Sequence, residues 1–323
     1  MTQPVQTPRP RLARRPVHGV LLLDKPLGMS SNQALQAARR LYRADKAGHT
    51  GTLDPLASGL LPICFGAATK FSQISLDADK RYRATLRLGQ TTSTGDAEGE
   101  VLQRREVALD RTAIDAAIAQ FCGEIVQRPP MHSALKHQGR ALYEYARAGV
   151  EIERTPRRVT IHGLRLLDWQ GELLELDVHC SKGTYVRTLA EDIGRLLGCG
   201  AHLAALRRTG SGALNVADAL TVEALAALDE PGRDARLLPA DALLAGWPRV
   251  RLNGGEAGRF LTGLRRRVTL ADAPAVRVYG PASEAIPCDA EVFLGSAHIV
   301  GGELIADRLL SPVEVAGLIE SKS

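Results

Sequence analysis

Apolar and polar positions alternate along the first two thirds of the chain in segments of strand or helix length, separated by glycine and proline. Apolar runs and two-residue alternation predict strands, whereas apolar residues three or four apart predict helices. The predicted strands are 17–26, 60–66, 81–89, 159–169, 173–180 and 202–212. The predicted helices are 30–44, 68–78, 111–123 and 184–198, with Ser30 and Thr184 as N-caps and Gly198 as a stop signal.

The connections between these elements favour an α+β fold with a mixed or antiparallel sheet. Strands 159–169 and 173–180 are separated by only a few residues, which is typical of an antiparallel pair. No G-x-G-x-x-G follows the first strand, so a dinucleotide-binding fold is disfavoured. The polar stretch 90–100 predicts a loop.

Two segments depart from this rhythm. Residues 127–158 are rich in proline, histidine and basic residues around one short helix, which predicts an insertion that projects from the core. From about 221 the chain becomes helical, acidic and punctuated by proline. After Trp247-Pro248, glycine-separated strand-like segments predict a small β-rich module. The expected organisation is therefore a basic flexible tail (1–16), a main domain (17–246) and a C-terminal module (247–323).

The composition bounds the class of protein. Of the 323 residues, 45% are apolar and 24% charged, as in an ordinary globular protein. No apolar run approaches the roughly 20 residues of a membrane helix, and the N-terminus lacks an apolar signal core. We therefore expect a cytoplasmic protein. The five cysteines form no C-x-x-C pair and lie near no histidine pair at ligand spacing, which argues against a disulfide framework or a zinc site.

Basic residues recur in clusters although the net charge is only +5. Such clusters are what a polyanion such as RNA requires. Arginines that merely solvate exposed faces would give the same pattern, so charge alone leaves both interpretations open. The clusters are RPRLARR near the start, RTPRR at 154–158, LRR at 206–208 and LRRR at 264–267.

The loop HTGTLDPLASG (49–59) holds the first candidate for chemistry. Asp54 precedes a proline, which favours an extended backbone, and the glycines at 48, 51 and 59 permit close approach to the backbone. A lone carboxylate acts as a nucleophile or a single general base, and either role requires a nearby cation. An aspartate that only caps a turn is the alternative.

Two further segments offer partners for this carboxylate. Arg187 falls in the first turn of the helix predicted at 184–198, where a cation opposes the helix dipole and so calls for an acidic partner. Tyr82 begins the strand at 81–89, where its ring could stack on a base and its hydroxyl act as acid or base. A surface arginine and a core tyrosine remain the plainer alternatives.

Taken together these segments resemble one family. VLLLDKPLGMSSN, HTGTLDPLASG, LLPICFGAATK, DADKRYRATLRLGQTTSTGDAEG, CSKGTYVRTLAEDIG and HLAALRRTGSG occur in the order and at the spacing of the tRNA pseudouridine synthase B (TruB) family, across residues 17–212. The insertion at 127–158 is similar to that of the stand-alone bacterial type. The resemblance implies a pseudouridine-synthase catalytic domain, followed by a PUA-like RNA-binding module that is supported only by its position, length and glycine-separated strands.

The resemblance also implies an activity and a set of site residues. The reaction is isomerisation of the uridine at position 55 in the T loop of tRNA to pseudouridine, with the target base flipped out of its stack. No metal, cofactor, guide RNA or obligatory protein partner is implied, and we expect a monomer. The implied roles are nucleophile (Asp54), its cationic partner (Arg187), base-stacking and proton-abstracting residue (Tyr82), uracil-pocket walls (Tyr185, Leu206), T-loop contact (His49) and active-site support (Lys25, Pro26, Lys70).

Three alternatives stay open at this point. The chain could be an RNA-binding or RNA-folding protein in which catalysis is secondary. It could be a guide-dependent synthase acting on ribosomal RNA. It could also be a glycoside hydrolase or lyase, although such enzymes use two carboxylates and Asp45, Asp77 and Asp79 form no evident pair with Asp54.

Overall fold

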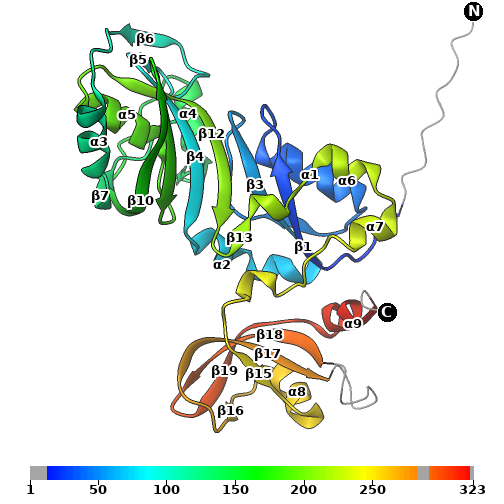
Figure 1. Cartoon of the computed structure of the whole chain (residues 1–323). Coiled ribbons are helices and arrows are strands. Elements are labelled where there is room, and N and C mark those ends of the chain that lie inside the picture. Colours follow the sequence, from blue (N-terminus) through cyan, green and yellow to red (C-terminus); the bar gives the residue numbers. More distant parts are fainter. Residues whose placement is uncertain (1–12, 282–290, 321–323) are drawn as a thin grey trace, which may run out of the picture.

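The computed structural model describes residues 13–281 and 291–320. Residues 1–12 of the expected tail lie outside the described residues, as do 282–290 and 321–323 of the expected C-terminal module. Within the described part the chain forms two modules, a large one built on a long curved sheet and a smaller one below it (Figure 1).

Ten strands form the large sheet, and its mixed character confirms the predicted fold class. The strand order is β14-β1-β3-β12-β4-β11-β10-β7, with β2 beside β3 and β13 beside β12. The β1–β14 and β3–β12 pairs are parallel and the others antiparallel. The strands are β1 (Gly19–Lys25), β2 (Ala47–His49), β3 (Ala57–Phe65), β4 (Lys80–Leu88), β7 (Gly123–Gln127), β10 (Arg157–Gln170), β11 (Leu173–Cys180), β12 (Ala201–Ser211), β13 (Leu214–Asn215) and β14 (Leu220–Thr221).

Three helices bury apolar faces against this sheet. Helix α1 (Ser31–Leu41) begins at Ser30 with a full capping box, as its sequence predicts, and packs on β1 and β3. Helix α5 (Val186–Leu196) packs on β12 and β4, and α3 (Arg111–Ala119) packs on β10 and α5, in a second core cluster. Burial of these aliphatic faces, at about 25 cal/mol per Å² of apolar surface, is what fixes the helices to the sheet.

Two local predictions are wrong. The N-cap of α5 is Tyr185 rather than Thr184, and no side chain caps it; the Thr184 hydroxyl instead donates to the carbonyl of Ser181. The stretch 90–100 is not all loop, because β5 (Gln90–Thr92) pairs with β6 (Val101–Arg104) across a polar turn. In both cases a partner close by in the chain, the Ser181 carbonyl for Thr184 and strand β6 for β5, overrides the local signal.

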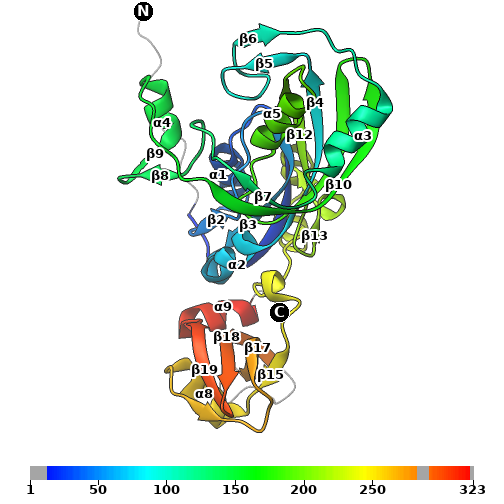
Figure 2. The ribbon, with the colours of Figure 1, turned by 90° about the vertical axis from the view of Figure 1, so that its left-hand side faces the viewer.

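The insertion predicted at 127–158 carries little regular structure. It contains the short strands β8 (Lys136–His137) and β9 (Arg140–Ala141) and the helix α4 (Leu142–Arg147). These elements stand away from the large sheet (Figure 2). The insertion leaves the sheet at the end of β7 and returns at the start of β10, which are neighbouring strands.

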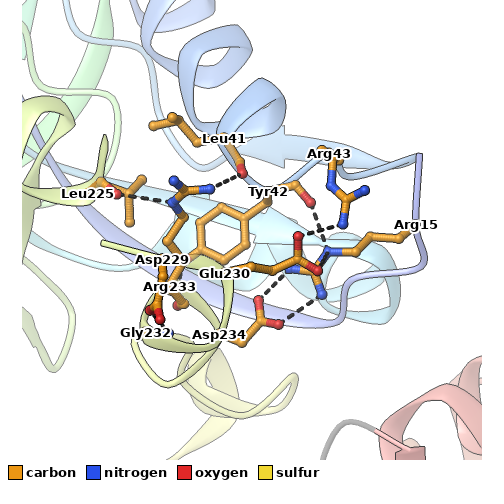
Figure 3. Close-up of polar contacts among 10 residues, drawn as sticks. All are labelled: Arg15, Leu41, Tyr42, Arg43, Leu225, Asp229, Glu230, Gly232, Arg233 and Asp234. Carbon is orange, nitrogen blue, oxygen red and sulfur yellow. Dashed lines mark hydrogen bonds and ion pairs between the residues drawn. The ribbon is translucent and has the colours of Figure 1, made fainter. Parts of the chain in front are cut away.

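The N-terminal segment is not wholly a flexible tail, because Arg15 is fixed to the body of the protein. Its guanidinium pairs with Asp234 and Glu230, and its backbone bridges to Ala44 (Figure 3). The same cluster joins the end of α1 to α7 (Glu230–Asp234), since the Tyr42 hydroxyl donates to the carbonyl of Arg233. The remaining elements of this region are η1 (Gly66–Phe71), α2 (Ser72–Asp77), η2 (Val216–Asp218), α6 (Val222–Ala227) and η3 (Ala242–Leu244).

The second sheet confirms the β-rich C-terminal module, but the sequence did not predict its helices. Its order is β15-β17-β18-β19-β16, comprising β15 (Arg249–Arg251), β16 (Arg266–Arg267), β17 (Ala273–Pro281), β18 (Glu291–Val300) and β19 (Glu303–Leu309). Helix α8 (Gly254–Leu261) packs on β17, and α9 (Pro312–Glu320) packs on β18.

The two modules share one apolar core. Val20 and Leu60 of the large sheet belong to the same buried cluster as Val276 and Leu294 of the small one. The rings of Phe71 and Phe293 lie 5.1 Å apart across the junction. Among the described residues no helix is both long and apolar enough to cross a membrane.

Candidate active site

A cavity of about 580 Å³ opens beside β3, β12 and β4, between the sheet and the insertion. Segments from six parts of the sequence line it. The structure therefore brings together five of the residues singled out by sequence, namely Asp54, Tyr82, Tyr185, Arg187 and Leu206.

The loop that carries Asp54 is fixed by short polar contacts on several sides. Ser31, buried at the start of α1, accepts from the Leu53 amide at 2.7 Å and donates to the Leu53 carbonyl at 3.0 Å. The Thr50 and Ser75 hydroxyls hydrogen-bond at 2.9 Å, which ties the start of the loop to α2. These contacts leave the Asp54 side chain 45% exposed, so the carboxylate faces the cavity from a rigid backbone.

Arg187 is the cation that the sequence called for. Its Nη2 lies 2.9 Å from Asp54 Oδ2, although 133 residues separate the two. The Arg187 side chain is only 7% exposed, and the other acceptors that surround it are Asp96 Oδ2 at 3.4 Å, the Thr94 carbonyl at 3.3 Å and the His132 carbonyl at 2.6 Å. The first-turn position that disfavours an arginine is thus compensated by two carboxylates.

Asp96 is a site residue that sequence reasoning missed. Its side chain is 4% exposed and accepts from the Thr94 hydroxyl and the Glu98 amide as well as facing Arg187. Buried ionised carboxylates are rare unless they are paired and hydrogen-bonded. In the sequence Asp96 lies in the polar stretch TTSTGDAEGE, whose composition predicts a loop and gives no sign that the aspartate is buried. Asp96 contacts Arg187 Nη1 while Asp54 contacts Nη2, so Asp96 helps to fix the guanidinium that orients Asp54.

Tyr82, Arg208 and Gly59 lie opposite one another on three neighbouring strands. Arg208 of β12 faces Gly59 of β3 and Tyr82 of β4. Gly59 has φ +99°, and a Cβ there would lie 2.3 Å from the carbonyl oxygen of Arg208. The glycine at this position therefore serves the close approach of the chain's own strand rather than that of a ligand.

Arg208 is wholly buried, which corrects the prediction that the LRR segment contacts phosphate. Its guanidinium donates to the carbonyls of Leu60 and Gly51, at 2.7 and 3.1 Å, and also hydrogen-bonds the Tyr82 hydroxyl. Its neighbour Arg207 pairs with Asp24 at 2.6 Å. Arg208 therefore lies in the cavity wall and is not exposed for phosphate contact, whereas the Arg207 side chain is 42% exposed.

Burial raises the pKa of Tyr82 above its ordinary value, and the adjacent Arg208 charge only partly offsets this. Tyr82 is therefore a protonated phenol near neutral pH. Its half-buried ring lies in the cavity wall, where it can stack on a base. The raised pKa works against proton abstraction, so the stacking role is the better supported of the two that were predicted.

Lys25 lies beneath the loop rather than in the cavity wall. It is fully buried and donates to the carbonyls of Pro26, at 2.9 Å, and Met29. Burial lowers the pKa of Lys25 to about 8, an effect that the negative charge of Asp54 opposes. The half-buried Pro26 presents its carbonyl to Lys25, so both residues shape the structure under Asp54.

Two predicted site residues lie outside the cavity wall. His49, on β2, is half-buried with no hydrogen-bond partner for its buried Nδ1 among the described residues, and burial lowers its pKa. Lys70 is not beside Asp54: its Nζ lies 2.5 Å from Glu314 and donates to the Leu309 carbonyl of the C-terminal module. The predicted role of Lys70 in supporting the active site is therefore wrong, and its side chain instead joins the large module to the C-terminal module.

The insertion contributes the outer wall of the cavity. Ser133 and Arg157 line it, together with Ala134 and Leu135. Ser133 Oγ and Arg157 Nε are buried, and within the described part of the chain neither has a hydrogen-bond partner. Polar atoms left in this state cost free energy unless something else binds them.

The arrangement places a carboxylate beside a pocket suited to a flat ring. Asp54 is oriented by a buried guanidinium, and Tyr82, Tyr185 and Leu206 supply two aromatic faces and an apolar edge. Such a site can add its carboxylate to an electrophilic carbon of a molecule whose planar ring is held between aromatic side chains.

Comparisons of the sequence agree with this geometry. Residues 39–186 match the family model described as TruB family pseudouridylate synthase (N terminal domain), and residues 187–245 match tRNA pseudouridylate synthase B C-terminal domain. The chain is 56% identical over 97% of its length to tRNA pseudouridine synthase B of Verminephrobacter eiseniae, of which 95% is covered. It is 57% identical over 94% of its length to tRNA pseudouridine synthase B of Burkholderia mallei, of which 97% is covered.

The chain belongs to the TruB family of pseudouridylate synthases. The family assigned from the motifs is thereby confirmed, and with it an isomerase class of enzyme. Among solved structures the chain resembles "Crystal Structure of a Cbf5-Nop10-Gar1 Complex", with a TM-score of 0.69 and 24% identity over 92% of this chain and 86% of that one. A second likeness, to an archaeal box H/ACA sRNP Nop10-Cbf5 complex, has a TM-score of 0.67 and 22% identity, covering 92% and 87%. At these identities the likeness establishes the fold.

Proposed function

We propose that the chain isomerises the uridine at position 55 in the T loop of tRNA to pseudouridine, with Asp54 as the nucleophile. The observation that carries the proposal is the 2.9 Å contact between Asp54 and the buried Arg187 at the wall of a cavity lined by two tyrosines. The relatives named tRNA pseudouridine synthase B, at 56–57% identity, supply tRNA as the substrate class.

The reaction exchanges one bond to the ribose for another. Asp54 attacks the nucleotide, the N1–C1′ bond breaks, and the uracil turns within the pocket. A C5–C1′ bond then forms and the bond between Asp54 and the nucleotide breaks, which regenerates the carboxylate. The C5 proton leaves to solvent and N1 takes up a proton, so that the product is an isomer of the substrate. Arg187 orients the Asp54 carboxylate through their ion pair, and Asp96 keeps Arg187 in place.

Reaching this site requires that the target base leave its stack, at a cost of a few kcal/mol. Stacking on an aromatic side chain returns about 1–3 kcal/mol per base, and Tyr82 and Tyr185 line the cavity. Burial lowers the pKa of His49 and so favours a neutral imidazole, which can pack against unstacked T-loop bases without the cost of burying a charge.

In this proposal the projecting insertion and the C-terminal module bind the remainder of the RNA arm. The insertion holds basic side chains, among them Lys136, Arg140 and Arg147, on elements that stand clear of the sheet (Figure 2). We take the C-terminal module, joined to the large sheet through a common core, as a PUA-like RNA-binding module. The chain on its own is taken to be sufficient, with no guide RNA and no partner protein.

The test is incubation of the purified chain with an unmodified tRNA transcript, followed by mapping of pseudouridine at nucleotide resolution. One new pseudouridine at position 55, formed without added RNA or protein and with no free uracil released, is the expected result. No modification by a folded chain, or modification only after a guide RNA is added, would overturn the proposal. Released uracil would instead indicate a hydrolase.

A further inference from the structure

We propose that Gln127 and Arg157, at the two roots of the insertion, are positioning residues that set the Tyr185 wall of the uracil pocket. The inference rests on the proposed function, because it assigns Tyr185 to the base-binding pocket. It adds a role for the insertion beyond holding RNA, namely that its base shapes the site of chemistry.

Gln127 holds the backbone of Tyr185 at two points. Its Oε1 accepts from the Tyr185 amide at 3.0 Å, and its Nε2 donates to the Tyr185 carbonyl at 3.2 Å. Gln127 is only 1% exposed, so these bonds form in a place where an unpaired amide would be costly. A primary amide is the side-chain group that donates and accepts in this way at once.

Tyr185, whose backbone Gln127 binds, lies at a helix start that no side chain caps. Tyr185 is the N-cap of α5, and its side chain makes no capping hydrogen bond. Helix starts leave several amides without partners, and the Gln127 carbonyl oxygen satisfies the one that belongs to Tyr185. Arg187, the cationic partner of Asp54, follows two residues later in the same helical turn.

Arg157 fixes the side chain of the same tyrosine. Its Cζ lies 4.8 Å from the centroid of the Tyr185 ring, a cation–π contact, and its Nη2 donates to the Gly183 carbonyl. Gly183 has φ +80°, and a Cβ there would lie 3.3 Å from Arg157 Cζ. The guanidinium therefore lies between the Gly183 turn and the tyrosine ring.

The two residues form one unit of the fold. Gln127 ends β7, Arg157 begins β10, and they face each other directly in the antiparallel ladder. The whole projecting part of the insertion lies between them in sequence. Within that part, the His132 carbonyl accepts from Arg187 at 2.6 Å, a further contact from the insertion to the reacting groups. Displacement of the insertion is thus transmitted to both Tyr185 and Arg187.

Gln127→Glu and Arg157→Lys test the geometry while keeping size or charge. Glutamate preserves the shape of Gln127 but cannot donate to the Tyr185 carbonyl, and lysine preserves the charge of Arg157 but lacks the planar fork. We expect each to lower the single-turnover rate about 10-fold or more, with the Kd for a T-arm hairpin within about three-fold and its salt dependence unchanged. Val126→Ala is the matched control, since Val126 precedes Gln127 and is exposed.

A double-mutant cycle decides whether Gln127 acts through the tyrosine ring. In a Tyr185→Ala background, Gln127→Ala should lower the rate less than about three-fold, because the wall it positions is gone. Wild-type rates for Gln127→Glu and Arg157→Lys, or an undiminished Gln127→Ala effect in that background, would overturn the inference. A rate loss that follows a parallel loss of binding or a steeper salt dependence would also overturn it. Wild-type chain that modifies no tRNA would instead contradict the proposed function.

Discussion

Replacing Arg187 by lysine separates the geometry of this side chain from its charge. The guanidinium reaches four acceptors at once: Asp54, Asp96 and the carbonyls of Thr94 and His132. A lysine ammonium is one nitrogen on a different stem and cannot hold both carboxylates in this arrangement. Because Asp96 is 4% exposed and Asp54 is 45% exposed, we expect the ammonium to stay with Asp96 and to release Asp54.

The size of the effect follows from the contact that is lost. A hydrogen bond to a charged group contributes about 1.5–3 kcal/mol, and each 1.36 kcal/mol changes a rate about ten-fold. Arg187→Lys should therefore lower the chemical step by about 10- to 150-fold. Stability should change little in this variant, whereas Arg187→Ala leaves the Asp96 carboxylate buried without its cation and should cost about 3–5 kcal/mol.

Both quantities can be measured on the same proteins. A T-arm hairpin with uridine tritiated at C5 releases its label when the C5–C1′ bond forms, so single-turnover release reports the chemical step. Urea unfolding reports stability. A lysine variant with the wild-type rate would refute the orienting role of Arg187. An alanine variant as stable as the wild type would show that Asp96 does not depend on Arg187.

Three further predictions concern the framework of the site. Gly59→Ala forces a Cβ to within 2.3 Å of a backbone oxygen at φ +99° and should cost more than about 3 kcal/mol in thermal or urea unfolding, while Gly48→Ala, with nothing within 4 Å, should cost less than about 1 kcal/mol. Burial lowers the pKa of Lys25 from 10.5 to about 8, so the unfolded chain binds more protons than the folded chain between these two pH values. The free energy of unfolding should therefore rise as pH increases from about 8 to 9.5, and Lys25→Met should flatten that rise. Glu314→Gln removes the ion pair with Lys70 and should lower the free energy of unfolding by about 0.5–1 kcal/mol near neutral pH. The hydrogen bond from Lys70 helps to hold the pKa of Glu314 below its usual 4.5, so the difference in stability between the variant and the wild type should vanish as pH falls through that lower value.

Six of the ten strands of the large sheet could be predicted because each of the six carries its own signal, whereas the strands β2, β7, β13 and β14 were not predicted. The apolar run that becomes β1 and the alternation that becomes β4 are visible without any knowledge of their neighbours. The order of the strands could not be read in this way. The adjacency of β3 and β12, which places Leu206 opposite Ala57 and Arg208 opposite Gly59, joins segments about 150 residues apart.

The same limit applies to the site. Asp54 and Arg187 were paired by family resemblance and by the misfit of a first-turn arginine, and the structure brings them to 2.9 Å. Asp96 was overlooked because an aspartate in a polar turn looks solvated until the fold buries it to 4% exposure. Arg208 was misread for the converse reason, since an arginine in a basic run looks exposed until its carbonyl partners are known.

The C-terminal module illustrates how weak local patterns fail. Helix α8 contains three glycines in eight residues, and α9 begins with a proline and contains a glycine. Neither has the helix-forming composition that a sequence-based prediction requires. Both form because their apolar residues, such as Phe260 and Val315, join the core shared with the large sheet.

The central claim is that Asp54 performs the chemistry on one uridine of tRNA. The most direct test compares wild type and Asp54→Asn on the same unmodified tRNA transcript, with pseudouridine mapped at nucleotide resolution and binding measured in parallel. Asparagine keeps the shape of the side chain and removes its charge, so we predict that modification at position 55 disappears while the Kd stays within about three-fold. Pseudouridine formed at that position by the Asp54→Asn protein would contradict the claim.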